Sequence, residues 1–389
     1  MIETKQQSNI RNLCKSDDSL QKYHTPYGLC EEIIQQLCEY IDLENSSILV
    51  MFNLEFVSTL INKAGVDPEN ITFMSDSEIR NRLAELLGVK IYRYNPFNLI
   101  NNRGEMKAMD KQFDVVIGNP PYNAPKLKES DGRGGRNTIW ESFVILATKL
   151  VNENGYLSFI HPPRWRKPKD KTWALLTQFD IKFIRFFDAE SGRSYFESGT
   201  RFDYYVLQKK SNHDHTSIID EKGISHSINI QKWPWLPSCE FNLVYSILAI
   251  EGEKVCPVMY SRSFYGRDKI WMSEKKSKKY FIPCVHSILK NEVRYMYSSV
   301  DKGFLGIPKV IISENGTIND VVIDMKGNLA FTSGCFAIPI SSKKEGEGIR
   351  KAIMSEKFDR LVQATKWSSF RIEYQMFKYF RHDFWKDFN

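Results

Sequence analysis

The sequence of 389 residues predicts an α/β fold, in which a doubly wound, mostly parallel sheet is followed by a second, mixed α+β domain. Between about residues 46 and 209, short apolar runs rich in β-branched and aromatic residues alternate with stretches of helical spacing. Beyond residue 231, aromatic and basic segments replace this alternation. The length also exceeds the usual size of a single hydrophobic core. We therefore expect two domains.

The first domain should contain seven buried strands with helices between them. The apolar runs place the strands at 46–52, 70–75, 89–94, 113–118, 155–161, 181–187 and 201–209. Helical spacing places helices at 28–41, 57–65, 78–88 and 139–155. Ligands bind at the carboxyl ends of the strands in such a sheet, so the loops that follow strands are expected to carry the site.

Four segments are expected along the chain. They are an N-terminal extension at 1–20, the α/β domain at 21–210, a connector at 211–230 and the second domain at 231–389. The connector is expected because its residues are predominantly polar.

The positive charge of the chain is concentrated in its second part. The net charge is +7, from 54 Lys and Arg against 47 Asp and Glu. Residues 231–389 hold 25 Lys and Arg against 17 Asp and Glu, a net +8, which leaves residues 1–230 at −1. A basic domain joined to a neutral one favours a nucleic-acid partner, because neutralising phosphates releases counterions. A basic surface that serves only solubility is the alternative.

Several classes of protein are not indicated. No run approaches the roughly 20 apolar residues of a membrane span, and the polar first residues lack the apolar segment of a signal peptide. We therefore expect a cytoplasmic protein without a membrane partner. The seven cysteines include no Cys-x-x-Cys pair, and the triplet His213-Asp214-His215 is typical of a solvated turn. No metal and no disulfide framework are expected.

The loop directly after the expected strand 113–118 carries the most specific chemistry, Asn119-Pro120-Pro121-Tyr122. The side-chain carbonyl of Asn119 and the main-chain carbonyl of Pro120 can accept hydrogen bonds from a planar amine, which draws its nitrogen toward a nucleophilic, tetrahedral state. The two prolines fix φ and make these acceptors rigid. Tyr122 offers a flat face to an extruded base. A proline-rich turn without chemistry is the structural alternative.

The segment FDVVIGNPPYN resembles the adenine-N6 DNA methyltransferases of the Eco57I-like and TaqI-like group. Further similarity in RNTIWESFVILATKLVNENGYLSFIHPPRW and over Phe304–Gly334 extends the resemblance to most of residues 20–389. The resemblance implies a class I methyltransferase, Rossmann-like fold, with S-adenosylmethionine as cofactor and double-stranded DNA as partner. It implies a target-recognition domain after the catalytic domain, and a partner methyltransferase or restriction subunit is also compatible with it.

The resemblance implies a cofactor site whose first part departs from the family pattern. Tyr23, Thr25 and Pro26 match the family's aromatic-x-Thr-Pro element at the methionine end of the cofactor, although a threonine cap with proline at the first helical position would look the same. After the first strand the family usually carries an acidic residue and Gly-x-Gly. This chain has no glycine there, and Asn53 and Glu55 are the polar residues that can replace the motif.

The next two strands supply the rest of the expected cofactor site. An acidic residue after the second strand commonly accepts hydrogen bonds from ribose hydroxyls, and Asp76 stands at that position. The alternative is that Asp76 or Ser75 caps the following helix. After the third strand, Asn95 and Phe97 are expected to contact the adenine ring of the cofactor.

The residues expected to hold the target fall into two groups. Tyr122 and Phe196 should stack on the flipped base, with Tyr195 as an equally placed alternative to Phe196. DNA contacts are expected from basic residues, which follow the fifth strand or lie among aromatic residues of the second domain: Arg164, Arg166, Lys167, Arg262, Arg267, Lys269, Lys275 and Lys276.

Site-specific methylation of adenine N6 in DNA is the function that the sequence favours. The absence of glycine over 52–56 motivates a first alternative, a degenerate, non-catalytic recognition subunit. A second alternative is a methyltransferase for RNA or protein, because the loop at Asn119 can orient any planar amide or amine.

Overall fold

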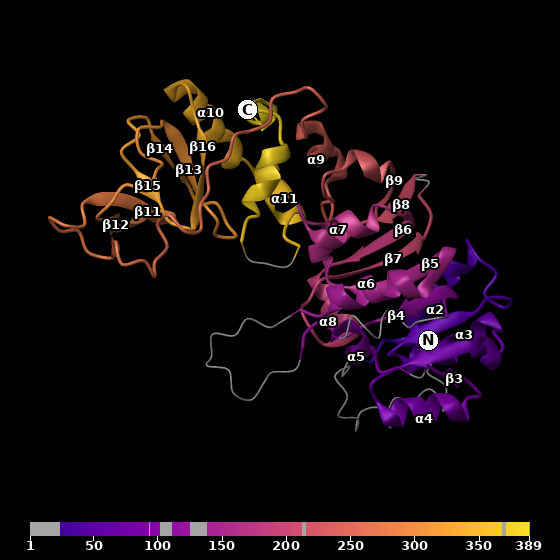
Figure 1. Cartoon of the computed structure of the whole chain (residues 1–389). Helices are drawn as coiled ribbons and strands as arrows, with labels where there is room; N and C mark the ends of the chain where they lie inside the picture. Colours follow the sequence, from indigo (N-terminus) through magenta and orange to yellow (C-terminus); the bar gives the residue numbers. More distant parts are fainter. Residues whose placement is uncertain are drawn as a thin grey trace. The chain divides into compact units, whose positions relative to one another are not determined.

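The computed structural model describes residues 24–92, 94–101, 111–124, 138–211, 215–367 and 371–388. The expected extension at 1–20 lies outside these residues. The chain divides into two compact units (Figure 1), the first comprising Met1–Trp165 with Lys169–Trp233 and the second comprising Arg166–Pro168 with Pro234–Asn389.

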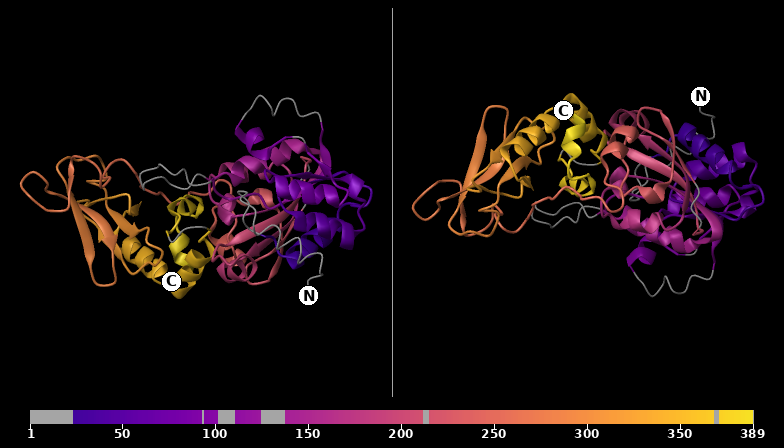
Figure 2. Two further views of the ribbon diagram at one scale, coloured as in Figure 1. Left: turned by 90° about the horizontal axis from the view of Figure 1, so that it is seen from below. Right: turned by 90° about the horizontal axis from the view of Figure 1, so that it is seen from above.

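The first unit is built on one nine-stranded sheet in the order β3-β2-β1-β4-β5-β7-β6-β8-β9. From β3 through β5 every neighbouring pair is parallel, and β7 is antiparallel to both β5 and β6. Figures 1 and 2 show these strands side by side. The predicted doubly wound, mostly parallel sheet is therefore confirmed. The strands are β1 (Ile48–Met51), β2 (Ile71–Met74), β3 (Lys90–Ile91), β4 (Phe113–Gly118), β5 (Val151–His161), β6 (Asp180–Phe187), β7 (Phe202–Gln208), β8 (Thr216–Ile219) and β9 (Ser225–Ile228).

Helices connect the strands, and α4, α7 and α8 begin at side chains that accept hydrogen bonds from their first turns. Ser77 caps α4 through the backbone N–H of Arg80, and Asp188 caps α8 in the same way. The helices are α2 (Tyr27–Cys38), α3 (Leu54–Ala64), α4 (Glu78–Leu86), α5 (Pro96–Asn101), α6 (Trp140–Leu150), α7 (Lys171–Leu176) and α8 (Ala189–Phe196), with short 3-10 turns η1 (Pro68–Asn70), η3 (Pro163–Arg166) and η4 (Ile230–Lys232).

Two expectations about these elements are wrong. The helix expected over 139–155 ends at Leu150, because β5 begins at Val151 and pairs with β4. The connector expected at 211–230 contains β8 and β9, which extend the large sheet beyond β6. Their polar composition reflects their place at the border of the sheet, where one side of β9 stays exposed.

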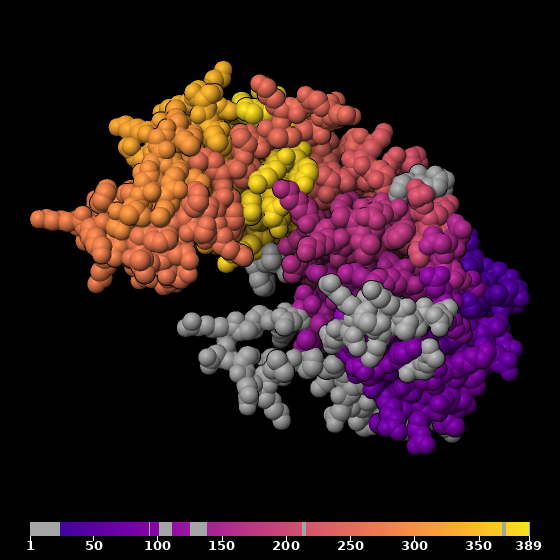
Figure 3. Space-filling model, viewed as in Figure 1, coloured from indigo at the N-terminus to yellow at the C-terminus, as the bar shows by residue number. Residues whose placement is uncertain are grey.

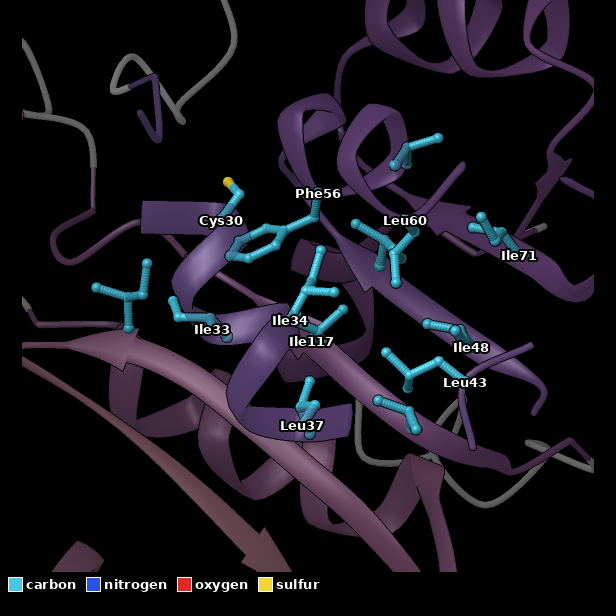
Figure 4. Close-up of a cluster of buried hydrophobic side chains, with 14 of the residues drawn as sticks. Cys30, Ile33, Ile34, Leu37, Leu43, Ile48, Phe56, Leu60, Ile71 and Ile117 are labelled. Carbon is cyan, nitrogen blue, oxygen red and sulfur yellow. The ribbon is translucent and has the colours of Figure 1, made fainter. Parts of the chain in front are cut away.

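Side chains of alternating strand positions form a core on each face of the large sheet. Figure 4 shows one face, where Ile48, Ile71 and Ile117 of the strands meet Ile34 of α2 and Phe56 of α3. The intervening strand residues are also fully buried, so they must contribute to the opposite face. Both faces are thus covered, as a parallel sheet requires.

The second unit contains two small sheets and several helices. One sheet has the order β10-β12-β11-β15 and the other the order β14-β13-β16. Figure 3 shows the surface of this unit in orange and yellow. Its elements are α9 (Phe241–Ile247), β10 (Met272–Ser273), β11 (Ile282–Ile288), β12 (Val293–Ser298), β13 (Lys309–Ser313), β14 (Val321–Asp324), β15 (Ala330–Phe331), β16 (Cys335–Pro339), α10 (Lys343–Ile353), α11 (Glu356–Ala364), η5 (Tyr374–Tyr379) and η6 (Phe384–Phe388).

Three strands of the large sheet end at the same level. Met51, the last residue of β1, pairs with both Met74 of β2 and Gly118 of β4. A Cβ atom on Gly118 would lie 2.5 Å from the backbone oxygen of Met51, so glycine allows β4 to approach β1 this closely. The turns after β1, β2 and β4 therefore emerge together at one edge of the sheet.

Candidate active site

The turn after β1 has the backbone shape of a glycine turn although it contains none. Phe52 has φ of 73°, in the left-handed region that disfavours side chains. Its N–H donates to the Met74 carbonyl at 2.8 Å, and its carbonyl accepts from Nη1 of the buried Arg80 at 2.9 Å. The Phe52 ring packs against Phe97 and Phe143, with centroids 6.0 and 5.0 Å away. These contacts offset the strain of the conformation.

Asn53 and Glu55, the residues expected to replace the missing glycine motif, are both buried, Asn53 in this turn and Glu55 in the first turn of α3. Oδ1 of Asn53 accepts a hydrogen bond from the backbone N–H of Asn119 at 3.2 Å. Among the residues that the structure describes, neither Nδ2 of Asn53 nor Oε2 of Glu55 has a hydrogen-bond partner, although both atoms are buried. A buried donor and a buried acceptor left open are costly, unless a ligand satisfies them.

Asn119 is held by both neighbouring segments. It is 3% exposed and directly follows β4. Its side-chain Nδ2 donates to Oγ1 of the fully buried Thr25 at 3.2 Å, while its backbone N–H is bound by Asn53. Asn119, Asn53 and Thr25, separated by up to 94 residues in sequence, thus form one connected group.

The segment before α2 makes a second contact to this turn that the sequence did not predict. Nδ1 of His24 pairs with Oε1 of Glu55, and the His24 ring meets Tyr27 edge-on at 5.7 Å. Pro26 begins α2, and its carbonyl accepts from the backbone N–H groups of two following residues. Tyr23 lies outside the described residues. His24 stands between two predicted residues, but nothing in the sequence pairs it with a carboxylate 31 residues away.

The rest of the loop that the sequence predicts to be catalytic directly follows Asn119. Pro120 and Pro121 are buried and Tyr122 is half-buried. The Tyr122 carbonyl accepts from the backbone N–H of Ile139 at 3.1 Å, and an antiparallel bridge joins Asn123 to Thr138. The loop is thereby attached to the beginning of α6, which limits where the Tyr122 ring can go.

The turn after β2 excludes the alternative that Asp76 or Ser75 caps the following helix. The cap of α4 is Ser77, whose hydroxyl accepts from the N–H of Arg80, so neither Asp76 nor Ser75 caps this helix. The Ser75 hydroxyl instead accepts from the N–H of Ser77 at 3.1 Å. Asp76 is half-buried at the edge where the three turns emerge. Its role as a ribose acceptor stays a prediction.

The turn after β3 places its two predicted residues differently. Asn95 is exposed, and its Oδ1 accepts from the N–H of Phe97 at 2.8 Å at the start of α5. This bond is a local cap, which explains an asparagine here without a ligand. Phe97 is half-buried, with its ring 5.3 Å from that of Phe143. Phe97 therefore lies beside the turn at Phe52, whereas the Asn95 oxygen is already engaged.

These residues are compatible with the amino-acid end of S-adenosylmethionine. That end carries an ammonium and a carboxylate, and the open atoms at this edge are a carboxylate oxygen of Glu55 and an amide N–H₂ of Asn53. The Glu55 carboxylate and the ammonium are opposite in charge, and the neutral Asn53 amide can donate hydrogen bonds to the carboxylate. The replacement of the glycine motif therefore leaves a polar site of the right chemistry.

The predicted phosphate contacts after β5 separate into two kinds. Arg164 is exposed. Arg166 is fully buried, and its Nη1 donates to the carbonyls of Leu236 and Pro237, at 3.4 and 3.0 Å. A guanidinium enclosed in this way serves to join two segments of the second unit, so the expected phosphate contact by Arg166 does not agree with the structure. Lys167 is half-buried and pairs with Glu373 at 3.5 Å.

Phe196 is packed on the core of the first unit, to which it belongs. It is half-buried at the end of α8, with its ring 5.0 Å from Phe202. Tyr195 is also half-buried and packs on the same core. The structure therefore does not distinguish the two as the second aromatic residue of the target site.

The basic residues expected to contact DNA in the second unit lie largely at its surface. Arg262, Arg267, Lys275 and Lys276 are exposed. Arg267 pairs with Glu274, and Lys269, which is one-third exposed, pairs with Asp268 at 3.1 Å. Exposed ion pairs of this kind are weak and can exchange for phosphates.

The described ranges hold neither a candidate metal centre nor a helix that could span a membrane. They contain no group of three or more His, Cys, Asp or Glu side chains placed to hold a metal ion. Within the same ranges, no helix is long and apolar enough to cross a bilayer.

The order of the large sheet, with antiparallel β7 between β5 and β6, and the polar turns at the ends of β1 and β4 define a class I methyltransferase fold. Residues 50–192 of the chain match the family Eco57I restriction-modification methylase. For this part of the chain, the resemblance to the Eco57I-like group is confirmed.

Two curated relatives each match part of the chain. One is an uncharacterized adenine-specific methylase of Mycoplasma pneumoniae, 33% identical over 141 residues, which covers 34% of this chain and 31% of the relative. The other is the type II restriction enzyme and methyltransferase RM.Eco57I of Escherichia coli, 26% identical over 160 residues, covering 37% and 14%. The matched part thus spans about a third or less of either relative.

Among solved structures, the DrdV–DNA complex is similar with a TM-score of 0.46. The sequences are 11% identical, and the match covers 94% of this chain and 57% of that chain.

Proposed function

We propose that the chain is an S-adenosylmethionine-dependent DNA methyltransferase that modifies N6 of a flipped adenine at specific sites. The observation that supports this most strongly is the buried Asn119 at the end of β4, bound through its backbone to Asn53 and through its side-chain amide to Thr25. The name of the Mycoplasma relative, an adenine-specific methylase, favours the same target. A preorganised acceptor is worth more than a mobile one, because it needs no rearrangement during the reaction.

In this proposal, Asn119 and Pro120 raise the nucleophilicity of the target amine. Their carbonyl oxygens accept hydrogen bonds from the two N6–H groups. These bonds localise the nitrogen lone pair and stabilise the positive charge that develops on nitrogen. Tyr122 stacks on the base, and the burial of Pro120 and Pro121 keeps the acceptors in place. Solvent takes the proton that the methylated amine loses.

The cofactor, when bound, supplies an electrophilic methyl group on a sulfonium. Glu55 would hold its ammonium and Asn53 its carboxylate, because these residues carry the open buried atoms. Asp76 and Phe97 would contact the ribose and the adenine ring. Exposed basic residues of the second unit, with Arg164, would contact DNA phosphates, and a partner methyltransferase or restriction subunit remains part of the proposal.

The test is to incubate the purified chain with S-adenosylmethionine and unmethylated genomic DNA and to quantify N6-methyladenine by mass spectrometry. Asn119→Ala should lower the turnover number by at least about 100-fold, as expected for loss of a preorganised electrostatic group, with little change in DNA affinity. The matched control is Asn70→Ala, an exposed asparagine just before β2, at the opposite edge of the sheet. An active Asn119→Ala enzyme would refute the assigned role.

Phe52 favours a second candidate, a degenerate recognition subunit without catalysis. A buried aromatic ring occupies the turn where the resembled family has glycines, and this reduces the space beside the cofactor. Calorimetry with S-adenosylmethionine separates the candidates. Binding heat together with new N6-methyladenine supports the enzyme, whereas DNA binding without heat or product supports the degenerate subunit.

A further inference from the structure

A carboxylate is buried at the end of the three-stranded sheet of the second unit. Glu314 follows β13 and is 5% exposed. Its backbone is fixed on both sides, because its N–H donates to the Gly334 carbonyl and its carbonyl accepts from the Ile372 N–H, both at 2.9 Å. The backbone position of Glu314 is therefore fixed.

Two arginines surround this carboxylate. Nη1 of Arg371 lies 3.6 Å from Oε2 of Glu314, and an antiparallel bridge joins Arg371 to Asn315. Arg371 itself is 67% exposed, so its guanidinium reaches from the buried carboxylate toward solvent. Arg262 is exposed, and its charge also acts on Glu314.

Two tyrosines stand beside the arginines. The rings of Tyr260 and Tyr374 are stacked, with centroids 4.0 Å apart and planes 22° apart. Tyr260 follows Met259, which is bridged to Ala337 of β16. We call Tyr260, Arg262, Glu314, Arg371 and Tyr374 the arginine–tyrosine cluster.

The chemistry of this cluster suits a base edge better than a phosphate. A phosphate needs only positive charge, whereas the cluster holds a buried carboxylate that would repel it. A carboxylate behind an arginine orients the planar guanidinium. Two of the guanidinium N–H groups can then donate to O6 and N7 of guanine in the major groove.

We propose that Arg371, positioned by Glu314, reads one guanine in the recognition sequence of the chain. This inference rests on the proposed function, which requires sequence-specific DNA binding. Glu314 is a positioning residue in this scheme, since it acts through Arg371 and does not touch the base.

The electrostatics of Glu314 supply an additional readout. Burial raises the pKa of Glu314 to about 7, although Arg371 and Arg262 act to lower it, and Glu373 adds to the rise. Tyr260, Tyr374 and Cys335 also adjoin the carboxylate and stay neutral near pH 7, because burial raises the pKa of each. Protonation of Glu314 would remove the charge that orients Arg371. The preference for guanine over the other bases at this position should therefore decrease as the pH is lowered from 8 to 6.

The experiment selects bound sequences from randomised duplex DNA with the full chain and identifies them by sequencing. The wild type should enrich a motif with a required guanine. Arg371→Lys should lower the preference for guanine at that one position by about 10-fold to 100-fold, because lysine cannot make the bidentate contact. Glu314→Gln should lower it less and abolish its pH dependence.

The matched controls are Arg350→Lys and Asp320→Asn, which alter an exposed arginine–carboxylate pair of the same unit with an N–O distance of 2.9 Å. Both should enrich the wild-type motif. An unchanged motif in Arg371→Lys, or no motif in the wild type, overturns the inference. Methylation is measured separately: a wild type that enriches a motif but forms no N6-methyladenine contradicts the proposed function, while a position-specific loss in Arg371→Lys still supports the inference.

Discussion

At the scale of single residues, the candidate site depends on contacts between side chains far apart in the sequence. The sequence identified Asn119, Thr25, Asn53 and Glu55, but it could not show that Asn119 bonds to Thr25, 94 residues away. Arg80 was missed altogether. It lies in a polar helix, α4, and its burial against the Phe52 carbonyl depends on the packing of that helix. A short sequence motif predicts the residues within it, but it does not predict which distant residues they contact in the fold.

Glu314 gives a prediction about stability that is separate from its proposed role in recognition. Its folded-state pKa of about 7 lies above its ordinary value of 4.5, so the folded state keeps a proton that the unfolded state releases. The free energy of unfolding therefore has this contribution in full below about pH 4.5 and loses it as pH rises through 7.

Glu314→Gln should consequently be more stable than the wild type at pH 8, by on the order of 1–3 kcal/mol, and similar to it at pH 4.5. Urea denaturation at the two pH values measures the difference. Equal stabilities at pH 8 would show that Glu314 ionises at no cost in the folded protein.

At the scale of elements, the strands were predicted well because all of them except β3 are largely buried on both faces. Seven apolar runs correspond to β1–β7 with boundaries shifted by a few residues. The polar β8 and β9 were missed, because alternate residues of β9 are exposed and leave no apolar run. A polar strand at the border of a sheet forms through backbone hydrogen bonds to its neighbour. These bonds leave no pattern in the amino-acid composition from which the strand could be predicted.

The close approach of β1 and β4 predicts the effect of one added methyl group. In Gly118→Ala, the new Cβ would lie 2.5 Å from the Met51 backbone oxygen, so the strands must separate. We expect a loss of about 1–3 kcal/mol in the free energy of unfolding, measured by urea denaturation.

Gly28→Ala is the matched control for Gly118→Ala. Gly28 lies in the first turn of α2, and a Cβ there would meet nothing within 4 Å. This variant should be as stable as the wild type or more stable by up to about 1 kcal/mol. A Gly118→Ala protein of wild-type stability and activity would show that the end of β4 tolerates displacement.

At the scale of the whole molecule, the uneven charge predicts how DNA binding depends on salt. The net charge of +8 beyond residue 230 should dominate the electrostatic part of binding. Lys275 and Lys276 are exposed residues of this region. Replacing both by glutamine should weaken binding to all sequences alike and reduce the slope of log K against log salt by about 2.

Fluorescence anisotropy with a labelled duplex at several salt concentrations measures this slope. The matched control replaces Lys343 and Lys344, exposed residues at the start of α10, by glutamine. An equal change in both double variants would mean that net charge, and not the position of Lys275 and Lys276, governs binding.

The burial of Arg166 has a consequence for attempts to exchange the second unit between this chain and a related protein. Arg166–Pro168 belong to the second unit, although 65 residues of the first unit, Lys169–Trp233, separate them from the rest of it. A chimera joined only at Trp233/Pro234 would carry foreign residues in place of Arg166 and leave the carbonyls of Leu236 and Pro237 without their donor. An exchange of the second unit must therefore include two pieces of chain, Pro234–Asn389 and the tripeptide Arg166–Pro168.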